Sequence, residues 1–266
     1  MQNKRVGVTI ARNAGAAAQV IGRQWAEQLG VPYFDRPQNS PVASLLKEQQ
    51  LTALIVVEKD GPRIHGDGGT FAYHPGMAVL RLQQLKRGGK EHLPAALALH
   101  DGSRVLDCTL GLAADAAIAA YCVGEKGRVV GVEASPLVHF AVNYGLANYV
   151  ADDADLTTAL RRIEAVCSTA EDYLRQCAPD SFDVVYFDPM FRNPVQGSDG
   201  MRALRPFSYE QPLSRTAVKL ALEVAPRVVI KERNEYILRG YGCHEFIGGR
   251  YSRVKYGIIT RTESNL

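Results

Sequence analysis

Short apolar runs alternate with segments of helical periodicity along most of the chain from about residue 100 onward. Val184-Val-Tyr-Phe187 and Val228-Val-Ile230 are apolar at every position, which is typical of strands buried on both faces of a parallel sheet. The runs predict strands at 104–108, 128–133, 163–167, 182–187 and 227–231, followed by an antiparallel hairpin of 244–247 and 256–260 around Gly248-Gly249.

Helices are predicted between these strands, because apolar residues recur there at helical spacing. The predicted helices span 113–123, 136–148, 170–176 and 215–224, and Pro136 stands at a tolerated first-turn position. Strands that alternate with helices form a parallel sheet covered on both faces. We therefore expect a doubly wound α/β fold for this part of the chain.

The first 95 residues show a shorter α/β pattern. It predicts strands at 5–11 and 54–58, a turn at 59–62 leading into another short strand, and helices over 14–29, 42–50 and 77–86. Gly30 is expected to stop the first of these helices. We predict a small N-terminal α/β domain over residues 1–75 and a larger domain over 76–266.

Composition narrows the class of protein. The 266 residues fit one large or two small domains, and 46% hydrophobic residues exclude wholesale disorder. No run approaches the ~18 apolar residues of a membrane span, and the first ten residues do not resemble a signal peptide. The five cysteines form no CxxC pattern and the six histidines show no metal-ligand spacing. We expect a cytoplasmic protein without a disulfide framework, a metal or a membrane contact.

The net charge of +3 conceals an uneven distribution. Residues 1–95 hold 12 Lys and Arg against 7 Asp and Glu, and residues 192–233 hold eight against four. Basic segments of this kind fit contact with a nucleic-acid backbone, although a solvated surface would look the same. Lys231 could meet phosphate or simply be solvated. Further candidates for this footprint are Arg12, Arg63, Arg81, Lys86, Arg87 and Lys90.

Two strand ends carry acidic residues that suit a nucleoside ligand. Asp107 ends the first strand of the larger domain, and Gly111 follows in the turn, but the GxGxxG pattern of pyrophosphate-binding loops is absent. A ligand without phosphate, especially a cationic one, fits this loop better. Glu133 ends the next strand 26 residues later, near the spacing at which an acid binds ribose hydroxyls. The alternative is that both acids simply end strands.

The third strand is followed by Ser168 and Thr169. The pattern Ser168-x-x-Glu171 predicts a helix-capping box, and it also places two hydroxyl groups where they could meet an adenine edge.

The fourth strand leads into Asp188-Pro-Met-Phe191. A carboxylate can accept a hydrogen bond from a planar amine, the carbonyl of Pro189 can accept another, and Phe191 can stack on the base. The alternative is an acid at a strand end followed by a turn.

Together these loops resemble those of class I S-adenosylmethionine (SAM)-dependent methyltransferases. Asp188-Pro-Met-Phe191 is similar to the [D/N]PP[Y/F] signature of amino-group methyltransferases, in the form found in the ribosomal small subunit methyltransferase J family. That family has a D-A-T-A-G-L-G-R-D-A-like first loop and a V-V-V-K-R-like strand. In this chain Ala113 and Ala114 replace the second glycine and the arginine, and Glu232 follows Lys231.

The resemblance implies a seven-stranded, mostly parallel Rossmann-like sheet, SAM as cofactor, and methyl transfer to guanine N2 in 16S rRNA or the small ribosomal subunit. The catalytic residues it implies are Asp188, Pro189 and Phe191. The cofactor contacts it implies are Asp107, Thr109, Gly111, Ala114, Asp115, Glu133, Ala134, Ser168, Thr169 and Asp188.

Other functions remain open at this point. The chain could methylate a protein or a small molecule, or bind SAM or RNA without turnover. A dinucleotide-dependent dehydrogenase fits poorly because the loop glycines are missing. The sequence does not indicate an oligomeric state.

Overall fold

The computed structural model describes residues 5–37, 40–66, 69–189, 207–209, 211–249 and 254–261. The chain forms two compact units. The first contains the described residues up to His74 together with Phe207 and Ser208, and the second contains those from Pro75 to Pro189 and from Tyr209 to Arg261. The sequence pattern divides the chain once, near residue 75, whereas the structure assigns Phe207 and Ser208 to the first unit.

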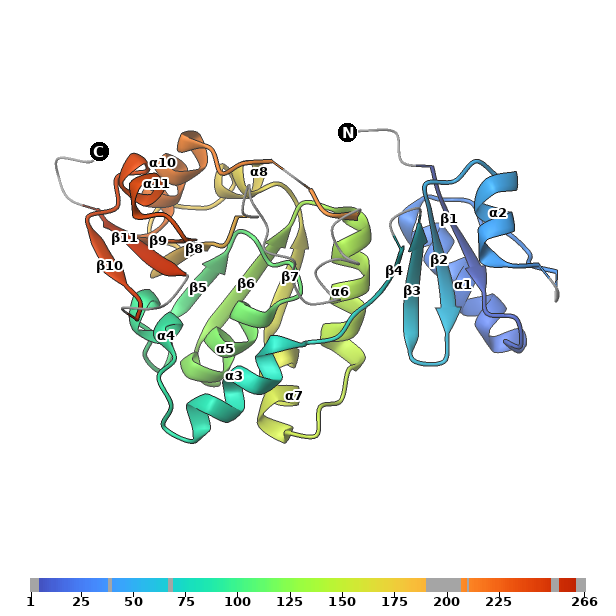
Figure 1. Ribbon diagram of the computed structural model, residues 1–266, viewed down its shortest axis with the longest axis horizontal. Helices are drawn as coiled ribbons and strands as arrows, with labels where there is room; N and C mark the ends of the chain where they lie inside the picture. The colour runs from blue at the N-terminus through green and yellow to red at the C-terminus, as the bar shows by residue number, and fades with distance from the viewer. Residues whose placement is uncertain are drawn as a thin grey trace. The chain divides into compact units, whose positions relative to one another are not determined.

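In its described residues, the first unit consists of a four-stranded sheet and two helices (Figure 1). Its strands lie in the order β1 (Val6–Ile10), β2 (Ala53–Glu58), β3 (Gly61–Gly66) and β4 (Gly69–Ala72). Strands β1 and β2 are parallel and the other pairs are antiparallel. Helix α1 (Ala16–Leu29) contacts β1 and β2, and α2 (Val42–Glu48) contacts β2.

Helix α1 ends as the sequence predicts. Gly30 adopts φ 63° and ψ 35°, a left-handed conformation that glycine reaches without a steric penalty. Later in the chain, Phe207 packs against the first unit and is only 2% exposed. A methyl group placed on Gly66 would lie 2.9 Å from Phe207 Cε1, so the absence of a side chain at Gly66 makes room for the ring.

The second unit contains a seven-stranded sheet in the order β10-β11-β9-β8-β5-β6-β7. The strands are β5 (Arg104–Asp107), β6 (Arg128–Glu133), β7 (Ile163–Cys167), β8 (Val184–Phe187), β9 (Arg227–Glu232), β10 (Glu245–Ile247) and β11 (Lys255–Thr260). Among these seven strands, β11 alone runs opposite to the rest, because it pairs antiparallel with both β9 and β10 while the other neighbouring pairs are parallel. The predicted doubly wound, mostly parallel sheet and its terminal hairpin are confirmed.

Helices cover both faces of this sheet (Figure 1). Helix α5 (Ala114–Val123) contacts α3 (Met77–Lys86), α4 (His92–Leu97) and α7 (Ala154–Arg161), and α6 (Pro136–Asn148) follows β6. On the other face α10 (Arg215–Val224) contacts α8 (Ala170–Leu174), and α11 (Glu235–Gly240) lies beside β9 and β11. Leu106, Val130, Val185, Phe187 and Val228 form the buried core under α8 and α10.

None of the helices within the described ranges is long and apolar enough to cross a membrane.

Candidate active site

Three acidic residues lie along one edge of the large sheet. Asp107, Glu133 and Asp188 stand at or just beyond the carboxyl ends of β5, β6 and β8. Strand β5 lies between β6 and β8 and is parallel to both. Because ligands bind at the carboxyl ends of the strands in open α/β sheets, this edge is the candidate site.

The loop after β5 organises this edge through Thr109. The Thr109 backbone N–H donates to Asp107 Oδ1 at 2.9 Å, and its hydroxyl lies 3.2 Å from the same oxygen. The Asp188 backbone N–H donates to Thr109 Oγ1 at 2.6 Å. One threonine therefore connects the end of β5 with the residue that follows β8. Burial raises the pKa of Asp107 to about 7.

The same loop contains two residues with left-handed backbone conformations. Gly111 has φ 49° and Ala113 has φ 59°. Alanine replaces glycine at the second position, although its side chain is disfavoured in this conformation. Ala113 is fully buried, so its methyl group contributes to packing there.

Glu133 is oriented by backbone groups on both sides. Gly111 N–H donates to Glu133 Oε2 at 3.2 Å, and Ser135 N–H donates to Glu133 Oε1 at 2.8 Å. Ala134 N–H also contributes a hydrogen bond that favours the ionised carboxylate, whereas burial raises the pKa of Glu133 overall. Each carboxylate oxygen keeps a lone pair with which it can accept from a ribose hydroxyl.

Asp188 is fixed through its side chain as well as its backbone. Lys231 Nζ, at the end of β9, lies 2.7 Å from Asp188 Oδ2. From the sequence alone, Lys231 is expected either to contact phosphate or to be solvated. The structure corrects both interpretations, because the Lys231 ammonium lies between two carboxylates and its side chain is only 18% exposed.

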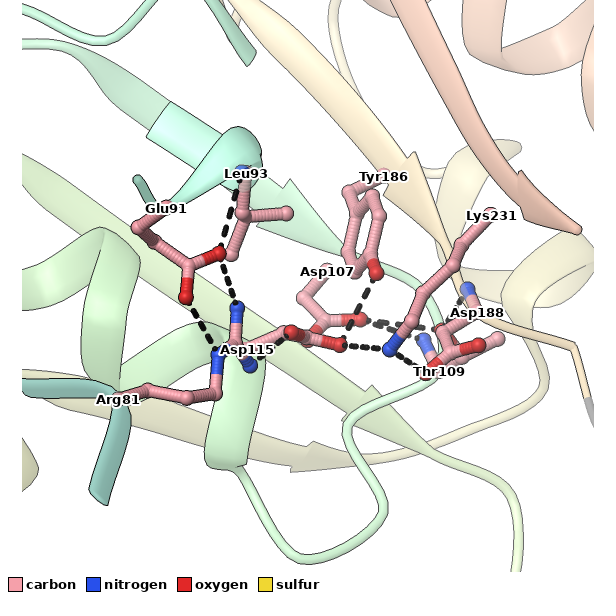
Figure 2. A network of polar contacts seen from close by, with 9 residues as sticks. All are labelled: Arg81, Glu91, Leu93, Asp107, Thr109, Asp115, Tyr186, Asp188 and Lys231. Atoms are coloured by element: carbon pink, nitrogen blue, oxygen red, sulfur yellow. Dashed lines mark hydrogen bonds and ion pairs between the residues drawn. The ribbon is translucent and has the colours of Figure 1, made fainter. Parts of the chain in front are cut away.

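The second of these carboxylates belongs to Asp115, in the first turn of α5 (Figure 2). Asp115 Oδ2 accepts from Lys231 Nζ at 3.0 Å and from the Tyr186 hydroxyl at 2.9 Å. Its Oδ1 accepts from Arg81 Nη1 on α3. Arg81 in turn donates through Nε and Nη2 to Glu91, at 3.0 Å each.

Acidic groups outnumber basic ones in this network of described residues. The network contains four carboxylates and two cations, namely Glu91, Asp107, Asp115, Asp188, Arg81 and Lys231. Burial alone would raise the pKa of Asp115, but Lys231 and Arg81 outweigh it and hold that pKa well below its usual range. Burial raises the pKa of Asp188, and the nearby Lys231 ammonium opposes this effect. The excess of carboxylates favours a cationic ligand at this edge.

The residues after β7 form a helix cap in a register different from the predicted one. Thr169, not Ser168, caps α8, since Thr169 Oγ1 accepts from Asp172 N–H at 3.2 Å. Thr169 Oγ1 also donates to Asp172 Oδ2 at 2.7 Å, so the acidic partner is Asp172 rather than Glu171. Ser168 N–H donates to the Glu133 carbonyl at 3.1 Å, which keeps Ser168 beside the end of β6.

The remaining predicted residues are distributed as follows. Ala114 begins α5 directly after the left-handed Ala113, and Pro189 is half-buried next to Asp188. Phe191 lies outside the described residues.

Arg81, Glu91 and Tyr186 were not predicted as site residues. The available signal was Lys231, which follows an apolar strand. A lysine in such a position is expected to be partly buried, and a buried charge needs a partner of opposite charge.

Two of the expected RNA contacts are internal. Arg81 belongs to the buried network, and Arg227 Nε donates to the Ala96 carbonyl at 2.8 Å. Lys86 is exposed but pairs with Asp153 at 2.7 Å. Among the described residues of the segment 192–233, Arg215 and Lys219 on α10 carry exposed positive charge.

Comparison with known proteins gives consistent matches. The family model described as "Putative SAM-dependent methyltransferase" matches residues 35–253. "Uncharacterized protein YpiP" of Bacillus subtilis (strain 168) is 36% identical over 208 residues, which cover 78% of this chain and 80% of that protein. "Ribosomal RNA small subunit methyltransferase J" of Cellvibrio japonicus (strain Ueda107) is 35% identical, covering 59% of this chain and 61% of that protein.

A solved structure has the same fold. The SAM-dependent methyltransferase NGO1261 from Neisseria gonorrhoeae aligns with a TM-score of 0.59 over 96% of this chain and 95% of its own, at 16% identity. Its strand-and-helix arrangement is that of the Rossmann-like class I methyltransferases, which confirms the predicted fold class.

The site fits the cofactor that this family implies. SAM has a ribose, whose hydroxyls can donate to Glu133, and a positively charged sulfonium, which suits an edge where carboxylates outnumber cations. It has no phosphate, in keeping with a loop that lacks the GxGxxG pattern. The chain belongs to the family of SAM-dependent methyltransferases and uses SAM as its cofactor.

Proposed function

We propose that this methyltransferase acts on RNA and transfers the methyl group to the exocyclic amino nitrogen of a nucleobase, guanine N2 of 16S rRNA or of the small ribosomal subunit. Asp188 carries the proposal. It follows β8 at the carboxyl ends of the strands, where the candidate site lies, and Pro189 comes next in the chain. Thr109 fixes its backbone N–H, and Lys231 fixes its carboxylate. Relatives named for methylation of small-subunit ribosomal RNA support the substrate class.

In the proposed mechanism the protein contributes mainly orientation. SAM supplies an electrophilic methyl group on its sulfonium sulfur. Lys231 engages Asp188 Oδ2 and leaves Oδ1 to accept a hydrogen bond from one amine N–H, and the Pro189 carbonyl accepts from the other. These two acceptors aim the nitrogen lone pair along the line of displacement, and such positioning supplies much of the rate of a methyl transfer.

Asp188 has a second role as charge develops on the nitrogen. Formation of the nitrogen–carbon bond would break the methyl–sulfur bond of the sulfonium and leave a neutral thioether. The methylated amine is more acidic, and Asp188 stabilises its positive charge and accepts the departing proton at Oδ1. A carboxyl group whose pKa is raised by burial is a better proton acceptor than an ordinary surface aspartate. Phe191 is expected to stack on the base.

The proposal includes a reducing, cytoplasmic setting, in keeping with five cysteines that are all free thiols.

Transfer of tritiated methyl groups from SAM tests the function directly. Small ribosomal subunits that lack the modification should be labelled, with the label on the RNA and at a guanine N2 after nuclease digestion. Labelled protein with unlabelled RNA would overturn the proposal. D188N should lose most activity. D183N is the matched control, because Asp183 lies at the amino end of β8, opposite to the site, and pairs there with Arg104.

A further inference from the structure

We propose that Lys231, itself held by Asp115, is a positioning residue that orients the Asp188 carboxylate and keeps it ionised to accept from the substrate amine. The inference rests on the proposed function of Asp188. It adds residues from α5 and β9 whose side chains need not touch either substrate.

The geometry places the Lys231 ammonium between two carboxylates. It is 2.7 Å from Asp188 Oδ2 and 3.0 Å from Asp115 Oδ2. Because both distances are those of charge-assisted hydrogen bonds, Asp188 cannot rotate without breaking one of them. An aspartate with one oxygen fixed in this way presents the other oxygen in a defined direction.

Asp115 is in turn held from three elements. It accepts from Arg81 on α3, from Tyr186 on β8 and from Lys231 on β9. Its side chain is 10% exposed and that of Arg81 is 14% exposed. Lys231 is therefore held by a carboxylate that is buried and that also accepts hydrogen bonds from Arg81 and Tyr186. A solvated lysine would have no such fixed partner.

The electrostatic effects of Asp115 and Lys231 on Asp188 have opposite signs. Lys231 favours the ionised form of Asp188, whereas the negative Asp115 disfavours it and also shares the Lys231 charge. The charged and titratable side chains that interact with Asp188, Lys231 or Asp115 come from several elements or the segments beside them: Arg81, Glu91, Asp107, Tyr186 and Tyr256. The network thus predicts that changes at Lys231 and Asp115 move the ionisation of Asp188 in opposite directions.

The test uses the full-length protein labelled with ¹³C at aspartate carboxyl carbons. The Asp188 resonance is assigned by its loss in D188N, and its titration is followed by NMR. K231M should raise the Asp188 midpoint by about one pH unit or more, and K231R should restore it. D115N should lower the midpoint. K126M, at a lysine that is 84% exposed, is the matched control and should change nothing.

Activity gives a second readout. In K231M the acidic limb of the pH profile of kcat should move upward by the same amount, and K231R should restore it. An unchanged Asp188 midpoint in both K231M and D115N would overturn the inference. If K231M does not fold, as judged by circular dichroism, K231Q takes its place with the same expected rise, and an unchanged midpoint in K231Q would overturn the inference.

The NMR titration requires no RNA. If the midpoints shift as expected but no RNA is methylated, the positioning role stands and the proposed substrate is wrong. If RNA is methylated and the midpoints do not move, the proposed function stands and the positioning role is wrong.

Discussion

Thr109 Oγ1 accepts a hydrogen bond from the Asp188 backbone N–H, so the loop after β5 directly holds the residue that follows β8. The two residues are 79 positions apart in sequence. Because the same hydroxyl also approaches Asp107, a single side chain determines the spacing between the proposed cofactor contacts and the proposed catalytic aspartate.

Thr109→Val preserves the shape of Thr109 but removes this acceptor. The Asp188 N–H then loses its partner, which should lower the free energy of unfolding by about 1–3 kcal/mol. We also expect kcat to fall more than the affinity for SAM. Urea unfolding and steady-state kinetics measure the two effects. Thr109→Ser keeps the hydroxyl and should retain most of both, so equal losses in the two variants would contradict the assigned hydrogen bond.

Asp107 makes stability depend on pH. Burial raises its folded-state pKa to about 7, well above that of an unfolded chain. Between about pH 4 and 7 Asp107 ionises in the unfolded chain but stays protonated in the folded protein. Its contribution to the free energy of unfolding is therefore fully present below this range and is lost as the pH rises. The loss is about 1.4 kcal/mol for each unit by which the two pKa values differ. Asp107→Asn does not ionise. Its stability relative to the wild type, from urea unfolding, should therefore improve between pH 5 and 8.

Glu133→Gln tests the ribose contact. Glutamine keeps the size of the side chain but removes the negative charge that strengthens hydrogen bonds from ribose hydroxyls. Loss of about 1.5–3 kcal/mol should raise the Kd for SAM by about 10- to 100-fold. Glu164→Gln on the neighbouring strand β7 is the control, since Glu164 forms an exposed pair with Arg128. Calorimetry that found the same Kd in both variants would exclude Glu133 as a ribose ligand.

Gly131 leaves space for the loop after β5, which contains Leu110. A methyl group at this position on β6 would lie 2.3 Å from Leu110 Cδ1, and Leu110 is buried. Gly131→Ala should displace the loop, costing about 1–3 kcal/mol of stability and weakening SAM binding. Leu110→Ala removes the clashing atoms, so the double variant should be more stable than the sum of the two single effects predicts. Strict additivity in thermal and urea unfolding would rule out the contact.

Much of the fold follows from local pattern. The structure confirms the predicted helices 77–86, 136–148 and 215–224 and the strands 128–133 and 163–167 with unchanged bounds. Among the described residues, four elements were missed: α4, α7, α11 and β4. They have four to eight residues each, too few for a hydrophobic period to stand out. Helix α7, for example, depends on Asp153, whose side chain accepts from Asp155 N–H.

The site likewise contains residues that the sequence could place and residues that it could not. Strand ends of a parallel sheet share an edge, so Asp107, Glu133 and Asp188 could be brought together from sequence alone. The partners of Asp188 could not. Lys231 and Asp115 are 116 residues apart, and their contact depends on how α5 packs on the sheet. Sequence indicates where charged groups stand along the strands, whereas the pairing of those charges is a property of tertiary packing.

The packing of Phe207 on Gly66 means that the boundary between the two units cannot be a single cut in the gene. A truncated chain that begins at Pro75 retains Phe207 but discards the surface that buries it, and it would present a bare aromatic ring to other molecules. Isolation of the methyltransferase unit therefore requires two edits: a new start at Pro75 and a short linker that joins Val195 to Tyr209. The same constraint applies to natural recombination, which could exchange the N-terminal unit only together with an insertion far downstream.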